Sequence, residues 1–365
     1  MNTTIKVVVV DDSAFMRKSL SLMLESDPQI KVVATARDGK EGIEKIREFK
    51  PDVVTLDVEM PVMDGLTALS VIMKEMPLPV LMVSSITTDG AKATIDALNL
   101  GAVDFIPKEL SYVSVNITKI KDDLITKIKQ IVQSSSLQFR MQRIRASQSR
   151  IQKSGSDPGP SARRTSIRPR SDLRAVVIGI STGGPFALLQ IIPKLPASFP
   201  LGVAIVQHMP PKFTKSLAER LNGLSEVEVR EASEGDRMQP GVVLIAPGGR
   251  HLTFHHSGGS VHVKTPLEPA NTLYRPCADI MMNSAVQAFQ GPLLGVIMTG
   301  MGKDGLEGLK AIKKRSGYVI AQDEETCVVY GMPKAAVDEG VVDTVLPLEE
   351  IPNALVAVTK EDGHG

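Results

Sequence analysis

Three side chains with the chemistry of a nucleophile, a base and an orienting carboxylate each follow a separate apolar run. They are Ser181, His208 and Asp304, and the runs span residues 175–180, 203–207 and 293–299. Short apolar runs of this kind predict buried parallel strands, whose carboxyl ends share one edge of a sheet. We therefore expect the three side chains to meet, and a hydroxyl, an imidazole and a carboxylate in contact can carry out acyl transfer.

The glycine-rich loop around Ser181 is open to two interpretations. Pro185 suits the first turn of a following helix, and the two glycines before it let a substrate approach the main chain. Such a loop can instead hold a phosphate or a nucleotide, although it matches neither the dinucleotide-binding nor the P-loop pattern. A second glycine-rich stretch precedes Asp304, and Met301 within it is a candidate oxyanion donor.

Each of these residues also has a plain structural interpretation. Asp304 could be an ordinary N-cap of the helix that it precedes, and a single histidine is often structural. Of the six histidines, however, only His208 ends an apolar run near the Ser181 loop. Four others fall in a predicted hairpin over 248–263: His251, His255, His256 and His262. Acidic and cysteine co-ligands are missing around them, so we do not expect a metal site there.

Three carboxylates gather in a similar way in the first third of the sequence. Asp11 and Asp12 follow the first predicted strand, and Asp57 follows the third. Like charges held this close raise one another's pKa unless a cation binds among them, and Mg²⁺ is the cation that carboxylates favour. Ser84 and Lys108 end the next two strands and add a hydroxyl and an ammonium suited to a phosphoryl group. Alternatively, each aspartate merely caps a helix.

Positioning these residues requires two α/β domains, each built on a doubly wound parallel sheet. Residues 1–132 alternate apolar runs with helix-period segments, which predicts a flavodoxin-like domain. Strands are expected at 5–10, 30–34, 53–56, 80–83 and 103–106. The helices include 13–25, with Ser13 as N-cap. The last helix carries an apolar stripe of Ile117, Ile120, Leu124, Ile128 and Ile131.

Residues 173–365 repeat the alternation and predict a second, Rossmann-like α/β domain. Its strands are expected at 175–180, 203–207, 242–246, 293–299, 318–322 and 341–345. Its helices include 213–221, 279–289 and 306–314. Ligands of such sheets bind beyond the carboxyl ends of the strands, which is where the nucleophile, base and carboxylate are expected.

Residues 133–172 differ from both domains, since they are rich in Ser, Gln, Pro, Gly and Arg and almost free of acids. We interpret them as a flexible basic linker, with a helical start over 137–144. A binding arm for nucleic acid or acidic lipid is the alternative, but no aromatic residue lies among the arginines after Phe139. A DNA-binding regulator would also need a reader such as a helix-turn-helix, whereas 173–360 alternates strands and helices.

The composition mainly excludes classes of protein. The formal net charge is +1, which indicates neither a nucleic acid nor a membrane surface as partner. Two cysteines, Cys277 and Cys327, do not make a disulfide framework. Neither a signal peptide nor a membrane-spanning run is recognised. We therefore expect a cytoplasmic, monomeric protein that is not inserted in a membrane.

The first domain resembles the response-regulator receiver family. The motifs that carry the resemblance lie at 10–13, 56–61, 63–65 and 83–85. The resemblance implies that Asp57 accepts a phosphoryl group from a histidine kinase, with Mg²⁺ bound by Asp11, Asp12 and Asp57 itself. The residues that it implies as the phosphorylation switch are Ser84, Phe105 and Lys108.

Residues 173–360 resemble the catalytic domain of chemotaxis protein-glutamate methylesterases. The shared motifs lie at 179–185, 207–210, 246–249, 298–305 and 330–333. The resemblance implies that Ser181, His208 and Asp304 form a cofactor-independent catalytic triad. Its substrates would be glutamyl methyl esters of methyl-accepting chemoreceptors, and particular glutamines would be deamidated. An unphosphorylated receiver would restrain this activity. One departure is Cys277, which stands where a Ser is expected.

Overall fold

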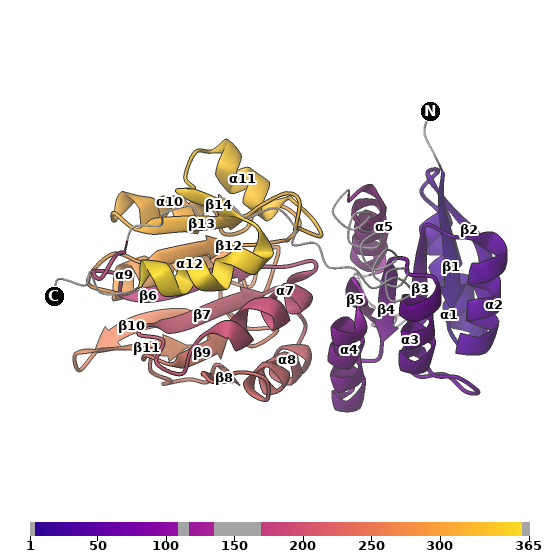
Figure 1. Cartoon of the computed structure of the whole chain (residues 1–365), viewed down its shortest axis with the longest axis horizontal. Coiled ribbons are helices and arrows are strands. Elements are labelled where there is room, and N and C mark those ends of the chain that lie inside the picture. Colours follow the sequence, from indigo (N-terminus) through magenta and orange to yellow (C-terminus); the bar gives the residue numbers. More distant parts are fainter. Residues whose placement is uncertain (1–3, 109–116, 135–168, 360–365) are drawn as a thin grey trace, which may run out of the picture. The chain divides into compact units, whose positions relative to one another are not determined.

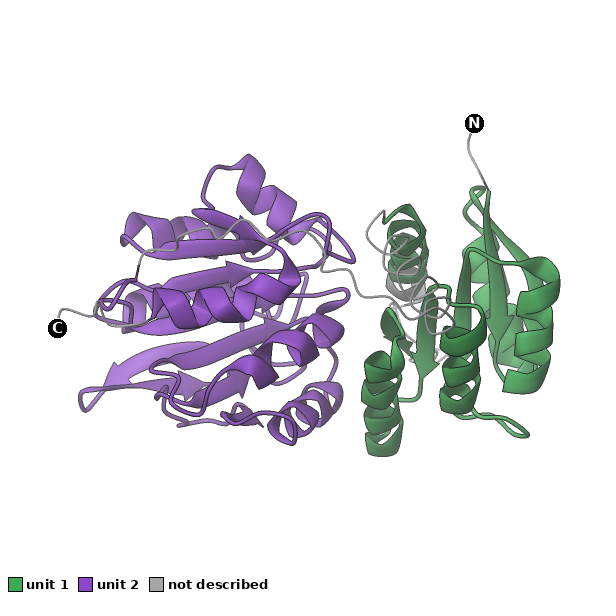
Figure 2. Ribbon diagram, viewed as in Figure 1, with its two compact units in different colours: residues 1–156 green, residues 157–365 purple. Residues whose placement is uncertain are grey.

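The structure is a computed structural model, and it describes residues 4–108, 117–134 and 169–359. The chain forms two compact units, residues 1–156 and 157–365, which Figure 2 colours separately. The division falls within the predicted linker over 133–172. Most of that linker, including the predicted helical start over 137–144, lies outside the described residues. The bounds 1–132 and 173–365 stay predictions.

Unit 1 contains a five-stranded parallel sheet in the order β2-β1-β3-β4-β5 (Figure 1). The strands are β1 (Ile5–Val10), β2 (Ile30–Ala36), β3 (Val53–Asp57), β4 (Val80–Ser84) and β5 (Asp104–Pro107). All the strands pair in parallel, which confirms the predicted flavodoxin-like sheet. The strand order reverses between β1 and β3, so a crevice opens at their carboxyl ends.

The helices of unit 1 pack in two groups that cover both faces of the sheet. One group is α1 (Ala14–Glu25) with α5 (Ile117–Gln133), and the other is α2 (Gly39–Phe49), α3 (Gly65–Glu75) and α4 (Thr88–Leu100). Helix α1 begins as predicted, because the hydroxyl of Ser13 accepts from the N–H of Met16 at 3.3 Å. Of the predicted stripe on α5, Leu124, Ile128 and Ile131 are buried. The side chains of Ile117 and Ile120 lie outside the described part.

Unit 2 contains a seven-stranded parallel sheet in the order β14-β13-β12-β6-β7-β9-β8 (Figure 1). The strands are β6 (Ala175–Ile180), β7 (Gly202–Gln207), β8 (Glu228–Glu231), β9 (Val242–Ile245), β12 (Leu294–Ile297), β13 (Tyr318–Gln322) and β14 (Thr344–Leu346). The chain leaves β6 toward β7 and returns to β12 on the other side of β6. The switch point therefore lies between β6 and β12, where ligands are expected.

Two groups of helices also cover the sheet of unit 2. One group is α7 (Gly184–Ile191), η1 (Ile192–Lys194), α8 (Phe213–Asn222), η2 (Leu348–Glu350) and α12 (Ile351–Val358). The other is α9 (Ala278–Ala288), α10 (Leu306–Lys314) and α11 (Met332–Asp338). The predicted hairpin is confirmed as β10 (Thr253–Ser257) with β11 (Ser260–Lys264), and β10 packs on α9. The hairpin thereby extends the core formed by α9 and the sheet.

Two strands of unit 2 differ from the prediction. Strand β8 is not predicted, because it is a mainly charged edge strand that pairs only with β9. The last strand is β14, and the predicted range 341–345 is wrong by several residues. The N–H of Val341 donates to the carbonyl of Ala336 and closes α11, so pairing with β13 begins only at Thr344.

Gly65 lies too close to β3 to carry a side chain. A Cβ at this position would lie 2.0 Å from the carbonyl oxygen of Asp57, and the N–H of Gly65 donates to the carbonyl of Val58 at 2.9 Å. We expect Gly65→Ala to lower the free energy of unfolding of unit 1 by about 2 kcal/mol or more, measured by urea denaturation. The control is Gly223→Ala, where a Cβ would meet no atom closer than 3.7 Å. An unchanged unit 1 transition in Gly65→Ala would contradict the close approach.

Candidate active site

Ser181 is the first residue after β6, and the neighbouring strands hold its main chain. Its N–H donates to the carbonyl of Thr299 at 2.9 Å, and its carbonyl accepts from the side-chain amide of Gln207 at 3.0 Å. The loop enters α7 through Gly183, whose φ of 75° favours glycine. Gly184 has no room for a side chain, because a Cβ would lie 1.9 Å from Oε1 of Gln207. Both glycines therefore serve to present Ser181.

His208 follows β7, the neighbour of β6, and contacts both other predicted catalytic side chains. Its Nδ1 lies 3.1 Å from Oγ of Ser181, and its Nε2 lies 2.7 Å from Oδ2 of Asp304. Because a carboxylate can only accept, Nε2 of the neutral ring carries the hydrogen, and Nδ1 accepts from the serine hydroxyl. All three residues are buried or nearly so. The contact that the sequence predicts among them is present.

Asp304 does not cap the helix that follows it, because α10 begins at Leu306 with Gly305 at the N-cap position. Its carboxylate instead accepts from the first turn of α9. The N–H of Ala278 donates to Oδ2 at 2.7 Å, and the N–H of Asp279 donates to Oδ1 at 3.0 Å. The N-cap interpretation of Asp304 is therefore wrong about the helix. Asp304 caps α9, which precedes Asp304 in the chain, and does not cap α10.

Helices α9 and α10 cap each other. The carboxylate of Asp279, in the first turn of α9, accepts from the N–H of Gly308 in the first turn of α10 at 2.8 Å. The first turn of α9 thus donates two N–H groups to Asp304, which lies just before α10, and the first turn of α10 donates one to Asp279 of α9. The thiol of Cys277 adds a donor to Oδ1 of Asp304 at 3.1 Å, in the position where a Ser is expected.

The pKa values of the titratable groups in this cluster shift in different directions. For Asp304, burial opposes ionisation, but the hydrogen bond from His208 and those from the N–H groups of Asp279 and Ala278 outweigh it and hold the pKa well below its usual value. For Asp279, burial is the largest effect and raises the pKa to about 6. Burial likewise raises the pKa of the Cys277 thiol to about 12, so the sulfur stays protonated and donates to Asp304.

Tyr274 is a functional-site residue that the sequence analysis does not identify. Its ring stacks on the imidazole of His208, with centroids 4.1 Å apart and planes 10° from parallel. Stacking covers one face of the imidazole ring and holds its plane in place. An aromatic residue in a loop gives no signal in the sequence of the side chain that it will face.

Thr299 is a second residue that the sequence analysis leaves without a role. Its hydroxyl donates to the carbonyl of Thr182 at 2.8 Å and accepts from the N–H groups of Val328 and Val329, each at 3.1 Å. It therefore joins the Ser181 loop to the segment that follows β13. A polar residue at the end of an apolar run is the signal that could have identified it.

Met301 lies on the loop after β12 and directly follows Gly300, which packs against Ser181. Its neighbour Gly300 packs so closely that a Cβ there would lie 2.8 Å from Cβ of Ser181. The N–H of Gly300 donates to the carbonyl of Val329, and its carbonyl accepts from the N–H of Gly331. The N–H of Met301 makes no hydrogen bond within the described part of the chain. It is therefore available as the oxyanion donor that the sequence suggests.

The hairpin histidines do not form a three-ligand metal site with the described residues. His255 and His262 are cross-strand partners with ring centroids 5.7 Å apart. His251 is fully buried, and its Nε2 donates to the carbonyl of Pro269 at 3.1 Å. Among residues 4–108, 117–134 and 169–359, the group that could hold a metal ion is instead Asp11, Asp12 and Asp57.

The three aspartates of unit 1 meet at the carboxyl ends of β1 and β3. One oxygen of each lies within 4.8 Å of the others. Nζ of Lys108 lies 2.6 Å from Oδ2 of Asp57 and 3.0 Å from Oδ2 of Asp11. Burial is the largest effect on Asp57 and raises its pKa to about 6, so additional positive charge would favour its ionised form. Clustered carboxylate oxygens are the donors that Mg²⁺ prefers, so the residues fit this ion.

The two remaining predicted residues of unit 1 are buried on the neighbouring strands. Ser84 ends β4, and its hydroxyl donates to the carbonyl of Gly90 in α4 at 3.1 Å. Phe105 lies on β5, with Nζ of Lys127 in α5 5.9 Å from its ring centroid. The Ser84 hydroxyl that we expect in the acidic crevice is therefore directed toward α4 in this structure.

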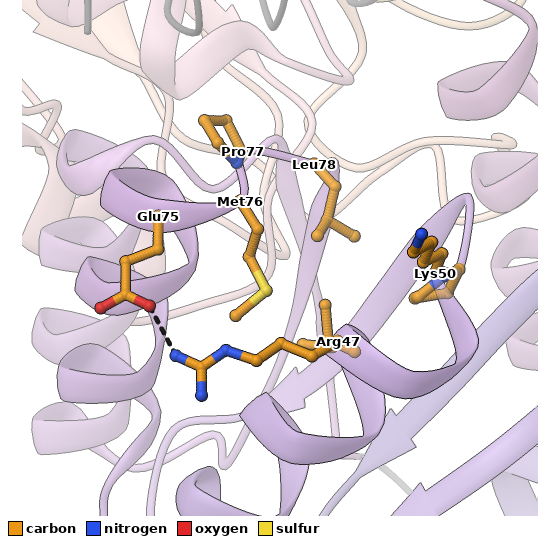
Figure 3. Close-up of a pocket in the computed structure, with 8 residues that line it drawn as sticks. Arg47, Lys50, Glu75, Met76, Pro77 and Leu78 are labelled. Atoms are coloured by element: carbon orange, nitrogen blue, oxygen red, sulfur yellow. Dashed lines mark hydrogen bonds and ion pairs between the residues drawn. The ribbon is translucent and has the colours of Figure 1, made fainter.

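Two hollows on unit 1 lie at opposite ends of the strands of its sheet. One of about 490 Å³ adjoins the acidic cluster and is lined by Asp12, Glu59 and Asp64 among others. The larger, of about 720 Å³, is shown in Figure 3 and includes the 2.5 Å ion pair between Arg47 and Glu75. It lies where β3 and β4 begin, at the opposite edge of the sheet from Asp57. Because parallel sheets bind ligands at the carboxyl edge, the smaller hollow is the candidate site.

The raised pKa of Asp279 predicts that acid stabilises unit 2 through this group. Its ionisation in the folded unit costs free energy above about pH 6, and the cost disappears below the ordinary value of 3.8. Asp279→Asn keeps an acceptor for the N–H of Gly308 and removes this dependence. We expect the variant to be more stable than the parent by about 1–3 kcal/mol at pH 7, and the difference to be nearly gone at about pH 3. Urea denaturation at both pH values measures the difference.

Asp304→Asn is the matched contrast, because the pKa of Asp304 is lowered. Its charged form contributes stability above the ordinary value of 3.8, and the contribution is lost as the pH falls toward the folded-state pKa. The variant should therefore be less stable than the parent at pH 7, and the difference should shrink in acid. A stability difference for Asp279→Asn that did not vary with pH would contradict the assignment.

Comparisons with known proteins agree with this two-part organisation. A family model described as CheB methylesterase matches residues 176–355, and one described as response regulator receiver domain matches residues 7–116.

No described helix combines the length and apolar character needed to cross a bilayer.

Similar proteins span nearly the whole chain. Protein-glutamate methylesterase/protein-glutamine glutaminase 1 of Oleidesulfovibrio alaskensis is 49% identical over 371 residues, covering 96% of this chain and 98% of that protein. The Pyrococcus abyssi protein-glutamate methylesterase/protein-glutamine glutaminase is 48% identical, covering 96% and 93%. Among solved structures, the crystal structure of the Thermotoga maritima CheB methylesterase catalytic domain matches 50% of this chain and 97% of that chain. The sequence identity is 47% and the TM-score is 0.49. Because the Oleidesulfovibrio and Pyrococcus relatives are 49% and 48% identical over nearly their whole length, the chain belongs to the CheB family of protein-glutamate methylesterases with a response-regulator receiver domain.

Proposed function

We propose that unit 2 hydrolyses methyl esters of glutamyl side chains on chemoreceptors, with Ser181 as nucleophile, His208 as base and Asp304 as orienting carboxylate. The observation that carries the proposal is the pair of hydrogen bonds from His208, 3.1 Å to Ser181 and 2.7 Å to Asp304. A phosphate or nucleotide cradle, the alternative for the Ser181 loop, would need no such base. An ionised carboxylate beside the loop would also repel an anion.

The reaction would begin with acylation of the serine. Nδ1 of His208 takes the hydroxyl proton of Ser181 while Oγ attacks the side-chain carbonyl carbon of the substrate. The carbonyl oxygen becomes an oxyanion, for which the N–H of Met301 is our candidate donor. The imidazolium then protonates the departing methoxy group, so that methanol leaves and an acyl-serine remains.

Deacylation would restore the enzyme. His208 removes a proton from water, the resulting hydroxide attacks the acyl carbon, and the proton returns to Oγ of Ser181 as glutamate leaves. Throughout, Asp304 keeps the hydrogen on Nε2 and stabilises the imidazolium, while Tyr274 covers one face of the ring. With a glutamine side chain, the same steps release ammonia in place of methanol. The deamidase activity in the names of the relatives would use this route.

We infer that unit 1 controls this reaction, with Asp57 accepting a phosphoryl group from a histidine kinase. A bound Mg²⁺ would supply positive charge that stabilises the transferred group. The residues that would hold it are Asp11, Asp12 and Asp57. Lys108 already pairs with Asp57, so an added phosphoryl group would redirect its ammonium. Ser84 and Phe105 connect this site to α4 and α5, whose surfaces would change and release the restraint on the esterase.

A cytoplasmic monomer is the form that we propose for the working enzyme. Both Cys277 and Cys327 are free thiols, which suits a reducing compartment. The enzyme would have to meet both the histidine kinase and the glutamyl side chains of the receptors in that compartment. No step of the proposed reaction calls on nucleic acid or on a cofactor for ester hydrolysis.

Ser181→Ala should reduce methanol release from methylated receptor membranes by about 10³-fold or more, because no oxygen remains to attack the ester. Methanol release and labelling by a fluorophosphonate probe measure the loss. Ser257→Ala, at the end of β10, is the control and should keep both. Undiminished methanol release by Ser181→Ala would remove Ser181 from the mechanism.

Asp57→Asn should lose stimulation by a phosphodonor, because an amide cannot form the acyl phosphate. The readout is the ratio of methanol release with and without acetyl phosphate in the presence of Mg²⁺, which should fall to about one. The control is Asp52→Asn, an exposed aspartate just before β3 that accepts from the N–H of Lys6. Stimulation that persisted in Asp57→Asn and resisted chelation of Mg²⁺ would refute control through this site.

A further inference from the structure

Two leucines are exposed on a loop beside the candidate active site. The loop runs over residues 265–276, between β11 and α9, and is called the rim loop here. Leu267 and Leu273 are 52% and 69% exposed, more than any other large apolar side chain in the described part of unit 2. Leu273 directly precedes Tyr274, whose ring stacks on His208. Leu273 is therefore one residue away from a side chain that contacts the candidate base.

The rim loop is held in place by hydrogen bonds, so the leucines are not exposed by fraying. Three side chains donate to its carbonyls. The pairs are Arg250 with Thr265 at 3.0 Å, His251 with Pro269 at 3.1 Å, and Arg275 with Ala270 at 2.8 Å. A single exposed leucine is common on protein surfaces, but two on one ordered loop next to a catalytic site indicate an interaction surface.

The shape of the substrate brings its main chain to this loop. In a glutamyl ester, the carbonyl carbon is three bonds from Cα, so the main chain lies within about 4 Å of the reacting atom. When that carbon reaches Oγ of Ser181, the residues that flank the glutamyl must pass over the rim of the site. Tyr274 contacts the base from the rim loop, so Leu273 next to it lies within reach of those residues.

The exposed cations near the rim loop fit an acidic partner. Lys212 follows the His208 segment, and Arg250 follows β9, the next strand in the sheet. Both side chains are exposed, and the guanidinium of Arg250 donates to the carbonyl of Thr265 in the rim loop at 3.0 Å. Esterase action converts each substrate side chain to a glutamate, so a substrate with several such positions becomes acidic. Positive charge on this rim would attract it.

We propose that the rim loop binds the substrate protein, with Leu267 and Leu273 covering apolar side chains that flank the glutamyl ester. Lys212 and Arg250 face neighbouring acidic side chains of the same substrate. The inference rests on the proposed hydrolase function and adds to it the surface that distinguishes a protein substrate from a small ester. Binding through this surface lowers KM for the protein substrate, whereas chemistry at Ser181 does not depend on it.

The test replaces both leucines together, as Leu267→Ser with Leu273→Ser, in the full-length chain. Two substrates are compared: methylated receptor in membranes, followed by methanol release, and p-nitrophenyl acetate. We expect KM for the receptor to rise about tenfold, with kcat little changed, because apolar contacts at an interface contribute to binding. Hydrolysis of p-nitrophenyl acetate and fluorophosphonate labelling should match the parent.

The matched control is Leu224→Ser, a leucine that is 45% exposed and follows α8 at the opposite edge of the sheet. It should leave both activities unchanged. An unaltered KM for the receptor in the double variant would overturn the inference, and so would an equal loss on both substrates, since the leucines would then support the catalytic site itself. Failure of the parent chain to release methanol would instead refute the proposed function, so the two failures are distinguishable.

Discussion

The candidate active site depends on the hydrogen bonds that converge on the carboxylate of Asp304. The imidazole of His208, the thiol of Cys277 and two main-chain N–H groups of α9 donate to its two oxygens. A buried carboxylate without such donors would be costly, whereas these donors keep it ionised and in one orientation. Because α9 and the residue before it supply three of the four, the position of α9 determines the orientation of the His208 ring. Asp279 then ties α10 to α9.

In both units, the functional groups lie at the carboxyl ends of the strands where the strand order reverses. In each sheet, the strand order reverses beside the first strand of the unit, and the carboxyl ends at that point carry polar side chains. The two crevices are nevertheless built differently. In unit 1, charge dominates, with Lys108 between Asp57 and Asp11. In unit 2, close packing dominates, because Gly300 lies against Ser181 and leaves no room for a side chain.

Strand positions and the approach of Ser181 to His208 could be predicted from the sequence because both follow from local pattern and from parallel pairing. Most buried parallel strands are visible in the sequence as apolar runs, although the beginning of β14 could not be located from its run. What the sequence could not predict are contacts set by how helices and loops pack. Asp304 caps α9 and not α10, and Tyr274 stacks on His208, because segments distant in the chain meet there. Strand β8 lacks an apolar run, and its pairing becomes visible only in the sheet.

The thiol that donates to Asp304 has a consequence for the enzyme under oxidative stress. Oxidants and alkylating agents react with the thiolate form of cysteine, and the pKa of Cys277 is raised to about 12 by burial first and by its carboxylate neighbours second. At neutral pH the thiol therefore stays protonated, so Cys277 is a poor target despite its hydrogen bond to Asp304 of the candidate triad. Cys327 is buried as well. The hydrolase should therefore tolerate peroxide and thiol-blocking reagents that inactivate enzymes with a cysteine nucleophile.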